Sequence, residues 1–453
     1  MTATAQLAGF GANHADFSAA VEQAATRHLI DTVGVIVAGI GQGVAAKLGP
    51  LLPNGDLPLP GRHQSDLAGY TGGLFAADHA YLCGTAAHGL ELDDGYREGS
   101  VHPGVAVVPA LIVAAQLRPV SGRKLLEALA IGYEGICTLA GGLHPALRDR
   151  GFHPTAAVGP LGAALAVSRV MGLDAETTQT ALGLAASEAG GLFAFLGGGG
   201  EVKRLHGGLA ARAGLMAARL AQTGVSAPAG ILERQSGYAQ AFGGVAAGDF
   251  SLTLPPLADW RMVGCYIKPH ACCRHLQPAL EALIALRKAH DLTPENVERI
   301  EVETYSIAAA HRETGWDDMA TAQLSFPYVL AQGLWKGRAA LGDFDENARR
   351  EPHANSLIAR LNIHASEEMD ALYPAQRPAR VRVHARGQLH TLFAPEASGS
   401  PDFPASDAAI SNKFLDLVAP ILGIDKANSW LAALWAIADQ EDAAPILIGP
   451  GVG

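Results

Sequence analysis

Cysteine is scarce in this 453-residue chain, and that scarcity excludes two kinds of architecture. The five cysteines are Cys83, Cys137, Cys265, Cys272 and Cys273. Their number and spacing do not suit a disulfide framework in a chain of this length. Two of them are adjacent and cannot form the usual CxxC pair, so a metal or iron–sulfur site has little support.

Long apolar runs and basic runs are also missing. Apolar stretches such as residues 32–46 are too short for a membrane span and are broken by glycine. The first residues lack the basic and apolar regions of a signal peptide. No run of Lys or Arg exceeds two residues, and the net charge of −11 argues against a nucleic-acid surface. We therefore expect a cytoplasmic protein that binds neither membrane nor nucleic acid, and that must gather positive charge locally to bind an anion.

What the chain does contain is helical patterning rich in Ala, Gly and Leu. With 49% hydrophobic and 17% charged residues, a chain of this length is globular and has room for two or three domains. Apolar residues recur at helical spacing in many segments before residue 223. These predicted helices cover residues 21–39, 105–117, 122–141, 156–171, 177–189 and 208–223. Small residues let helices approach closely, which favours a compact bundle.

The pattern changes after Trp260. Residues 276–290 predict one amphipathic helix, and Thr293-Pro294-Glu295 is typical of a helix start. Alternation over residues 299–305 predicts a strand, and residues 379–385 and 388–393 predict a hairpin.

The fold class we predict is mainly α. A large helical bundle would be built from both chain ends, at residues 1–264 and 398–453. A smaller α+β lid domain would be inserted at residues 265–397. A Gly/Ser/Pro-rich run at residues 396–404 marks the return to helix, which is expected from Asp407.

One charged block interrupts this apolar chain. Between His88 and His102 it carries four carboxylates and an arginine: Glu91, Asp93, Asp94, Glu98 and Arg97. Because burying an unpaired charge is costly, such density predicts either a solvated loop or the wall of a polar pocket.

Two further blocks precede helices. His153 lies beside Thr155, which is expected to cap a helix, so the histidine is either a capping-loop residue or an anion ligand at that terminus. Lys203 and His206 follow glycines 197–200 and would share one helix face. They form either a solvated surface pair or, with the glycines as a hinge, a clamp for a carboxylate.

The last two blocks belong to the inserted region. Lys268, His270, Cys273, Arg274 and His275 gather at the predicted domain junction, which suits a cleft for an anionic substrate. Ser325 and Tyr328 form a hydroxyl pair beside an apolar helix, although Tyr328 is equally well explained as a half-buried aromatic residue.

Taken together, these blocks resemble the MmgE/PrpD superfamily, which includes 2-methylcitrate dehydratase, cis-aconitate decarboxylase and iminodisuccinate epimerase. The resemblance rests on five motifs in order along nearly the whole chain. They are the acidic block ending His102-Pro-Gly, Gly151-Phe-His153-Pro-Thr, Lys203-Arg-Leu-His206-x-Gly, Lys268-Pro-x-x-x-Cys273-Arg-His275 and Ser325-Phe-Pro-Tyr328.

The resemblance implies a homodimer without metal or organic cofactor, with an active site between bundle and lid for small di- or tricarboxylates. The residues carried over are Glu91, Asp93, His102, His153, Lys203, Lys268, Cys273 or His275, and Tyr328. Two departures weigh against the itaconate-forming reaction. The threonine that follows the paired acids in the dehydratase and decarboxylase branches is absent, and Cys273 stands where the decarboxylase branch has histidine.

The chemistry common to such enzymes is proton abstraction next to a carboxylate. Histidine suits the acid or base role, and cations stabilise the developing charge. As catalytic residues we predict His102, His153, Lys203, Lys268 and Tyr328. As substrate-binding residues we predict Glu91, Asp93, Arg97, His206, Cys273, Arg274 and His275. A cofactor-independent, dehydratase-type lyase is our first prediction. The alternatives are an epimerase of an aspartate-like or iminodiacid substrate and a non-catalytic ligand-binding or scaffold protein.

Overall fold

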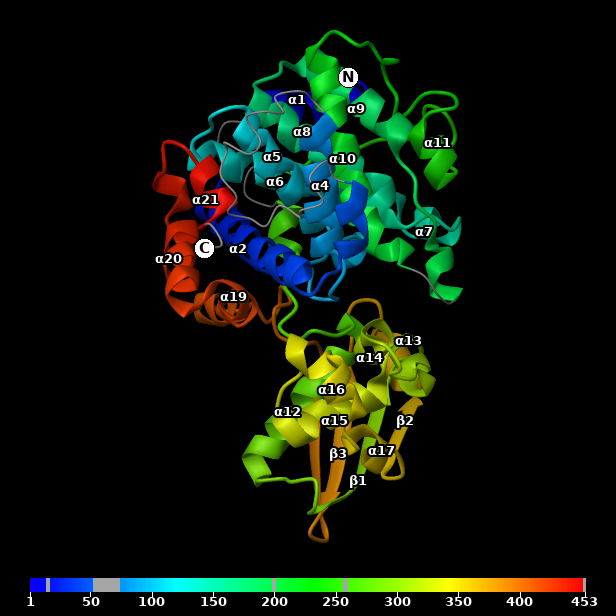
Figure 1. The fold of residues 1–453 in the computed structure, drawn as a ribbon. Coiled ribbons are helices and arrows are strands. Elements are labelled where there is room, and N and C mark those ends of the chain that lie inside the picture. Colours follow the sequence, from blue (N-terminus) through cyan, green and yellow to red (C-terminus); the bar gives the residue numbers. More distant parts are fainter. Residues whose placement is uncertain (14–16, 52–73, 198–200, 256–259, 451–453) are drawn as a thin grey trace. The chain divides into compact units, whose positions relative to one another are not determined.

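The computed structural model describes residues 1–13, 17–51, 74–197, 201–255 and 260–450, and the chain forms two units (Figure 1). The helical unit comprises residues 1–89, 93–267 and 406–453, and the α+β unit comprises residues 90–92 and 268–405. The predicted fold class, a helical bundle made from both chain ends with an inserted α+β unit, is confirmed. That the inserted unit acts as a lid stays a prediction.

The helical unit consists of α-helices joined by short 3-10 turns. Its α-helices are α1 (Ala3–Asn13), α2 (Ala19–Gly41), α4 (Leu74–Ala87), α5 (Gly104–Leu117), α6 (Gly122–Leu143), α7 (Ala146–Asp149), α8 (Pro154–Met171), α9 (Ala175–Glu188), α10 (Val202–Gln222), α11 (Tyr238–Gly243), α19 (Asp407–Leu422), α20 (Ile424–Trp435) and α21 (Ala444–Ile448). The 3-10 turns are η1 (Ala46–Leu51), η2 (Arg97–Gly99), η3 (Phe193–Gly197), η4 (Arg261–Gly264) and η8 (Ile437–Asp439). All six helices predicted before residue 223 are present. Among the described residues, no helix combines the length and apolar character needed to cross a membrane.

Glycine allows the central helices to approach closely. A Cβ placed on Gly84 of α4 would lie 2.7 Å from the backbone of Gly207 on α10. On Gly162 of α8 it would lie 2.6 Å from the carbonyl oxygen of Gly132 on α6. Any larger side chain at these crossings would force the helices apart. The Ala/Gly-rich composition thus brings α4, α6, α8 and α10 together around the buried polar groups described below.

The C-terminal helices complete the same bundle. Helix α19 begins after the N-cap Ser406, whose hydroxyl accepts from the amide of Ala409, and packs against α2. Lys413 of α19 lies 2.6 Å from the buried carboxylate of Asp31 on α2. Burial raises the pKa of Asp31, and the lysine opposes that shift.

The α+β unit is built on a four-stranded sheet. Its strands are β1 (Val297–Thr304), β2 (Leu361–Ala365), β3 (Ala379–Ala385) and β4 (Gln388–Ala394), in the order β2-β1-β3-β4. Its α-helices are α12 (Gln277–His290), α13 (Ser306–Ala309), α14 (Met319–Leu324), α15 (Phe326–Lys336), α16 (Glu346–Arg350), α17 (His353–Ile358) and α18 (Glu367–Leu372), with 3-10 turns η5 (Arg274–Leu276), η6 (Ala310–Glu313) and η7 (Leu341–Phe344). The β1–β2 pair is parallel and the other two pairs are antiparallel. Helix α12 packs on β3 and β4.

The predicted hairpin is confirmed as β3–β4, and its turn residues Arg386 and Gly387 both have positive φ. The expectation of a helix start at Thr293-Pro294-Glu295 is wrong, because these residues form a turn that leads into β1. Strand β2 was not predicted. It has five residues of mixed exposure and gains its hydrogen bonds from β1, about sixty positions earlier in the chain, so no local alternation reveals it.

Candidate active site

The two adjacent aspartates of the acidic block are buried. Asp93 is 3% exposed and Asp94 is 1% exposed, whereas Glu98 lies at the surface. Of the two interpretations of this block, the solvated loop is therefore wrong for the aspartates. Residues 90–92 belong to the α+β unit, while the residues on either side belong to the helical unit.

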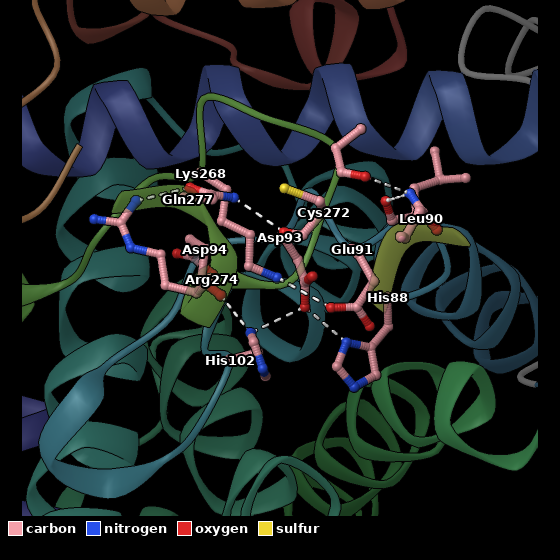
Figure 2. Close-up of polar contacts among 12 residues, drawn as sticks. His88, Leu90, Glu91, Asp93, Asp94, His102, Lys268, Cys272, Arg274 and Gln277 are labelled. Atoms are coloured by element: carbon pink, nitrogen blue, oxygen red, sulfur yellow. Dashed lines mark hydrogen bonds and ion pairs between the residues drawn. The ribbon is translucent and has the colours of Figure 1, made fainter. Parts of the chain in front are cut away.

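His102 is held through one of its ring nitrogens. Its Nδ1 lies 2.5 Å from the main-chain oxygen of Asp94 and 3.1 Å from Oδ2 of Asp93 (Figure 2). Both oxygens can only accept, so Nδ1 must carry the hydrogen. The lone pair of a neutral His102 is then on Nε2, which makes Nε2 the nitrogen that can take up a proton. The side chain is 16% exposed, so a small molecule can approach it.

His88 shares the same carboxylate. Its Nδ1 lies 2.7 Å from Oδ2 of Asp93, again as the donor (Figure 2). Burial lowers the pKa of His88 to about 3, although the Asp93 charge opposes the shift. The imidazole is therefore neutral at physiological pH. Its buried Nε2 has no hydrogen-bond partner among the described residues, so the lone pair on this nitrogen is not engaged by any of them.

His153 and His206 form a second pair. Their Nδ1 atoms lie 2.9 Å apart and can share one hydrogen, so one ring donates and the other accepts. Burial lowers the pKa of His153, reinforced by the neighbouring histidines. Burial also lowers the pKa of His206, and the positive charge of Lys203 adds to that effect. Both rings therefore favour the neutral form.

Ring contacts connect the two pairs. The His88 ring centroid lies 5.2 Å from that of His102 and 5.6 Å from that of His153. We call His88, Asp93, His102, His153 and His206 the histidine cluster. The prediction that Thr155 caps α8 is wrong. His153 itself is the N-cap with Pro154 at the first helical position, and the Thr155 hydroxyl accepts from the amide of His102.

The sequence placed Lys203 and His206 on one helix face, and both lie on α10. The positive charge of Lys203 lowers the pKa of His88 as well as that of His206. Most of the glycine run proposed as a hinge, residues 198–200, lies outside the described residues.

In the α+β unit, Lys268 is buried and pairs with Glu91. Its Nζ lies 3.4 Å from Oε2 of Glu91, which has a φ of 53° (Figure 2). The side-chain amide of Gln323 holds this turn in place, because it donates to the carbonyl oxygens of Leu90, at 2.6 Å, and Ala271, at 2.9 Å. Sequence reasoning missed Gln323, since nothing local marks it as a partner of Leu90, 233 positions earlier, or of Ala271, 52 positions earlier.

Arg274 is directed at main-chain oxygens. Its guanidinium donates at 2.8 Å to the carbonyls of Ala397 and Ser398 and at 3.0 Å to Oε1 of Gln277. The buried carboxylate of Glu396 lies 3.5 Å away. This geometry favours a role in holding the chain rather than in binding substrate.

The other predicted residues of this region are also tied to the protein. His275 Nδ1 and the Tyr305 hydroxyl are hydrogen-bonded, and the amide of Cys273 donates to Gln323 at 2.9 Å. Ser325 caps α15 and donates to the carbonyl of Thr314, while the Tyr328 hydroxyl donates to the carbonyl of Asp343 at 2.6 Å. We call Lys268, Arg274, His275, Ser325 and Tyr328 the cationic–hydroxyl block. Arg97, in η2 of the helical unit, lies 3.5 Å from the exposed Glu98.

Asp94 has three partners that the sequence did not suggest. The Tyr133 hydroxyl and Nδ1 of His28 each lie 2.7 Å from its Oδ2, and the amide of Gly104 donates to its Oδ1 at 3.0 Å. His28 lies within α2 and Tyr133 within α6, and no sequence motif marks either residue as a partner of Asp94. Among the described residues, no group of three His, Cys, Asp or Glu side chains has an arrangement suited to a metal ion.

Comparison with known proteins adds a family. The model of the MmgE/PrpD N-terminal domain matches residues 5–250, and that of the MmgE/PrpD C-terminal domain matches residues 270–438. Cis-aconitate decarboxylase of Aspergillus terreus is 28% identical over 322 residues, covering 65% of this chain and 64% of the relative. A cis-aconitate decarboxylase-like protein of Aspergillus oryzae is 30% identical over 317 residues, covering 64% of each. Cis-aconitate decarboxylase of Mus musculus is 27% identical over 401 residues, covering 82% of this chain and 78% of the relative. The matches to the two Aspergillus relatives thus span less than two thirds of their length.

Proposed function

Because the chain belongs to the MmgE/PrpD family, we propose that it is a lyase that transfers a proton next to a carboxylate of a small di- or tricarboxylate. The observation that carries this proposal is the fixed tautomer of His102. Two acceptors hold its Nδ1 hydrogen, and its Nε2 is left to exchange a proton with a substrate.

In the elimination we propose, Nε2 of His102 takes the proton from the carbon next to a substrate carboxylate. The C–H electron pair becomes the new double bond as the hydroxyl group on the adjacent carbon leaves with a second proton, as water. That second proton requires an acid, and the His153–His206 pair is our candidate. Because both rings favour the neutral form without substrate, the pair must first take up a proton, which the negative charge of a bound carboxylate would favour. Lys203 and Lys268 are the proposed partners of the substrate carboxylates, since a carbanion next to a carboxylate adds charge to an anion.

Decarboxylation is the second candidate, and the printed names of the relatives favour it. In that reaction a C–CO2 bond breaks, carbon dioxide leaves, and the remaining electron pair takes a proton from a histidinium. The same histidine then works as an acid. An epimerase, which would return the proton to the opposite face of the same carbon, is the remaining alternative. That the chain needs no metal or organic cofactor and forms a homodimer stays a prediction.

Incubation in deuterium oxide with a panel of hydroxy, unsaturated and imino di- and tricarboxylates, followed by proton NMR, separates these reactions. Loss of water indicates the dehydratase, release of carbon dioxide indicates the decarboxylase, and deuterium incorporation without net loss indicates the epimerase. His102→Gln retains the size of the residue and removes its titration, so we expect a turnover loss on the order of 10² to 10⁴.

The matched control is His390→Gln, which makes the same change on β4 of the α+β unit at a residue that is not a member of the histidine cluster, and should leave turnover unchanged. Wild-type turnover in both His102→Gln and His153→Gln would contradict the proposed acid–base role. Failure of every acid in the panel to react would contradict the substrate class.

A further inference from the structure

Three separate elements of the helical unit contact the carboxylate of Asp94. Oδ2 receives the Tyr133 hydroxyl from α6 and faces His28 of α2, each at 2.7 Å. Oδ1 receives the amide of Gly104, the first residue of α5, at 3.0 Å. Asp94 is 1% exposed, so water does not compete for these contacts.

The space around this carboxylate is filled. A Cβ added to Gly104 would lie 2.6 Å from the Thr32 hydroxyl, 2.7 Å from the Tyr133 hydroxyl and 2.9 Å from Oδ1 of Asp94. Glycine at this position therefore lets the backbone reach the carboxylate. Any side chain at position 104 would collide with this carboxylate or its partners, so the contacts of Asp94 with α2, α5 and α6 depend on glycine here.

The other end of Asp94 faces His102. Its main-chain oxygen receives the His102 Nδ1 hydrogen at 2.5 Å. Asp94 thus accepts two hydrogen bonds from within residues 94–104. Its main-chain carbonyl accepts from His102, and its carboxylate accepts from the amide of Gly104. An anchored carboxylate restricts where the Asp94 backbone can lie, and so restricts the positions open to its carbonyl.

We propose that Asp94, anchored by His28 and Tyr133, is a positioning residue for His102. Together with Oδ2 of Asp93, the Asp94 carbonyl favours the tautomer with hydrogen on Nδ1 and leaves Nε2 as the proton acceptor. The catalytic consequence rests on the proposed function, but the tautomer itself does not. Asp94 touches no substrate in this assignment. It acts through the ring of His102, as His28 and Tyr133 act through Asp94.

Three variants test this chain of contacts. Asp94→Asn keeps the shape but replaces a carboxylate that accepts from the Tyr133 hydroxyl and the Gly104 amide and faces His28. The segment should therefore shift, and the main-chain oxygen of residue 94 should move away from His102. Tyr133→Phe removes one donor and leaves the carboxylate in place, which is a milder change. Glu127→Gln is the matched control, because it makes the same carboxylate-to-amide change at a buried glutamate of α6 that pairs with Arg169 of α8.

The direct readout is the tautomer of His102, measured by nitrogen-15 NMR of histidine-labelled protein and assigned with His102→Gln. We expect a single Nδ1–H tautomer in the wild type and in Glu127→Gln, and a mixture in Asp94→Asn. For a histidine held in the wrong tautomer we expect kcat to fall by about 10² or more while KM changes little. Tyr133→Phe should shift both readouts in the same direction by less.

The outcomes separate the inference from the proposed function. A folded Asp94→Asn that keeps the Nδ1–H tautomer and wild-type kcat overturns the positioning role. If Asp94→Asn does not fold, Tyr133→Phe decides in the same way, since an unchanged tautomer and kcat overturn it too. Wild-type turnover in His102→Gln would contradict the proposed base, while the tautomer measurement would still judge the role of Asp94.

Discussion

The histidine cluster of the helical unit and the cationic–hydroxyl block of the α+β unit are both polar and largely buried, yet their hydrogen bonds differ in kind. In the cluster, histidine nitrogens face Asp93, the carbonyl of Asp94 or one another, and Nε2 of His88 has no partner among the described residues. In the block, Arg274, Ser325 and Tyr328 donate to main-chain oxygens.

This difference separates two uses of polar side chains. A donor directed at a carbonyl of its own unit completes the hydrogen bonding of the backbone, and removing it leaves a buried acceptor unsatisfied. A ring that is fixed through one nitrogen keeps the other for proton transfer. We therefore expect substitutions in the block to change mainly stability and substitutions in the cluster to change mainly turnover. Lys268 is the test of this rule, because it pairs with the carboxylate of Glu91.

The largest effect is expected for Arg274→Met. It removes the donor of two carbonyls and leaves the buried carboxylate of Glu396 without its guanidinium, which is typically worth about 3–5 kcal/mol. The measurement is the free energy of unfolding in denaturant, compared with turnover of the remaining folded protein. Arg350→Met, at an exposed pair with Glu346, is the control and should cost less than about 1 kcal/mol. If Arg274→Met is as stable as the wild type but loses turnover, Arg274 binds substrate, as the sequence predicts, and does not mainly hold the chain.

Lys268→Met should show the opposite pattern. Methionine keeps most of the buried stem and removes the charge, so we expect turnover to fall by about 10² to 10³, the usual loss for a group that stabilises developing charge. The melting temperature should stay close to that of the wild type. Lys336→Met removes a lysine paired with Asp343 in the same unit and serves as the control. A collapsed melting temperature with unchanged turnover would make Lys268 a structural partner of Glu91.

The helices and the hairpin could be predicted because their signals are local. Apolar spacing of 3.6 residues gave α5, α6 and α8, and alternation around Arg386-Gly387 gave β3 and β4. Strand β2 stayed hidden because it depends on a partner far away in the chain. Residue type and block position were enough to mark His102, His153 and Lys203 as candidates.

The partners of those candidates could not be predicted. Gln323 reaches Leu90 across 233 positions, and Tyr133 reaches Asp94 across 39. Neither Gln323 nor Tyr133 belongs to a sequence motif that marks it as a partner of these residues. Which ring nitrogen of His102 carries its hydrogen depends on such contacts. The sequence therefore marked candidate residues, whereas the contacts that orient their side chains required the folded chain.

Acid should destabilise the helical unit through its buried histidines. Burial lowers the pKa of His79 to about 4 and of His88 to about 3, below the value of about 6.5 for an unfolded histidine. Below about pH 6.5 the unfolded chain therefore binds protons that the folded chain does not. As the pH is lowered, the free energy of unfolding decreases by up to about 1.4 kcal/mol per pH unit for each group.

Denaturant unfolding at about pH 7 and about pH 5 measures this slope. His79→Leu removes one such group outside the histidine cluster, so the slope should decrease while turnover is retained. An unchanged slope in His79→Leu would show that this histidine is charged in the folded protein, contrary to its burial. His88→Phe should decrease the slope as well but also lower turnover, because it takes a partner from Asp93.

The smallest effect is expected for Tyr328→Phe, which decides between two roles for a residue that the sequence marked as catalytic. The hydroxyl donates at 2.6 Å to the carbonyl of Asp343 in a fully buried site, and burial raises the pKa of Tyr328 above its usual value. A phenol that is neutral and committed to a carbonyl is a poor acid. Phenylalanine leaves that carbonyl unsatisfied, so we expect a stability loss of about 1–3 kcal/mol with kcat and KM close to wild type.

Tyr238→Phe, which removes a hydroxyl bonded to the carbonyl of Ala157 in the helical unit, should lose a similar amount of stability. A Tyr328→Phe enzyme with wild-type stability and a turnover loss of about 10² would instead place its hydroxyl on the substrate, and the rule drawn from main-chain partners would fail at this residue.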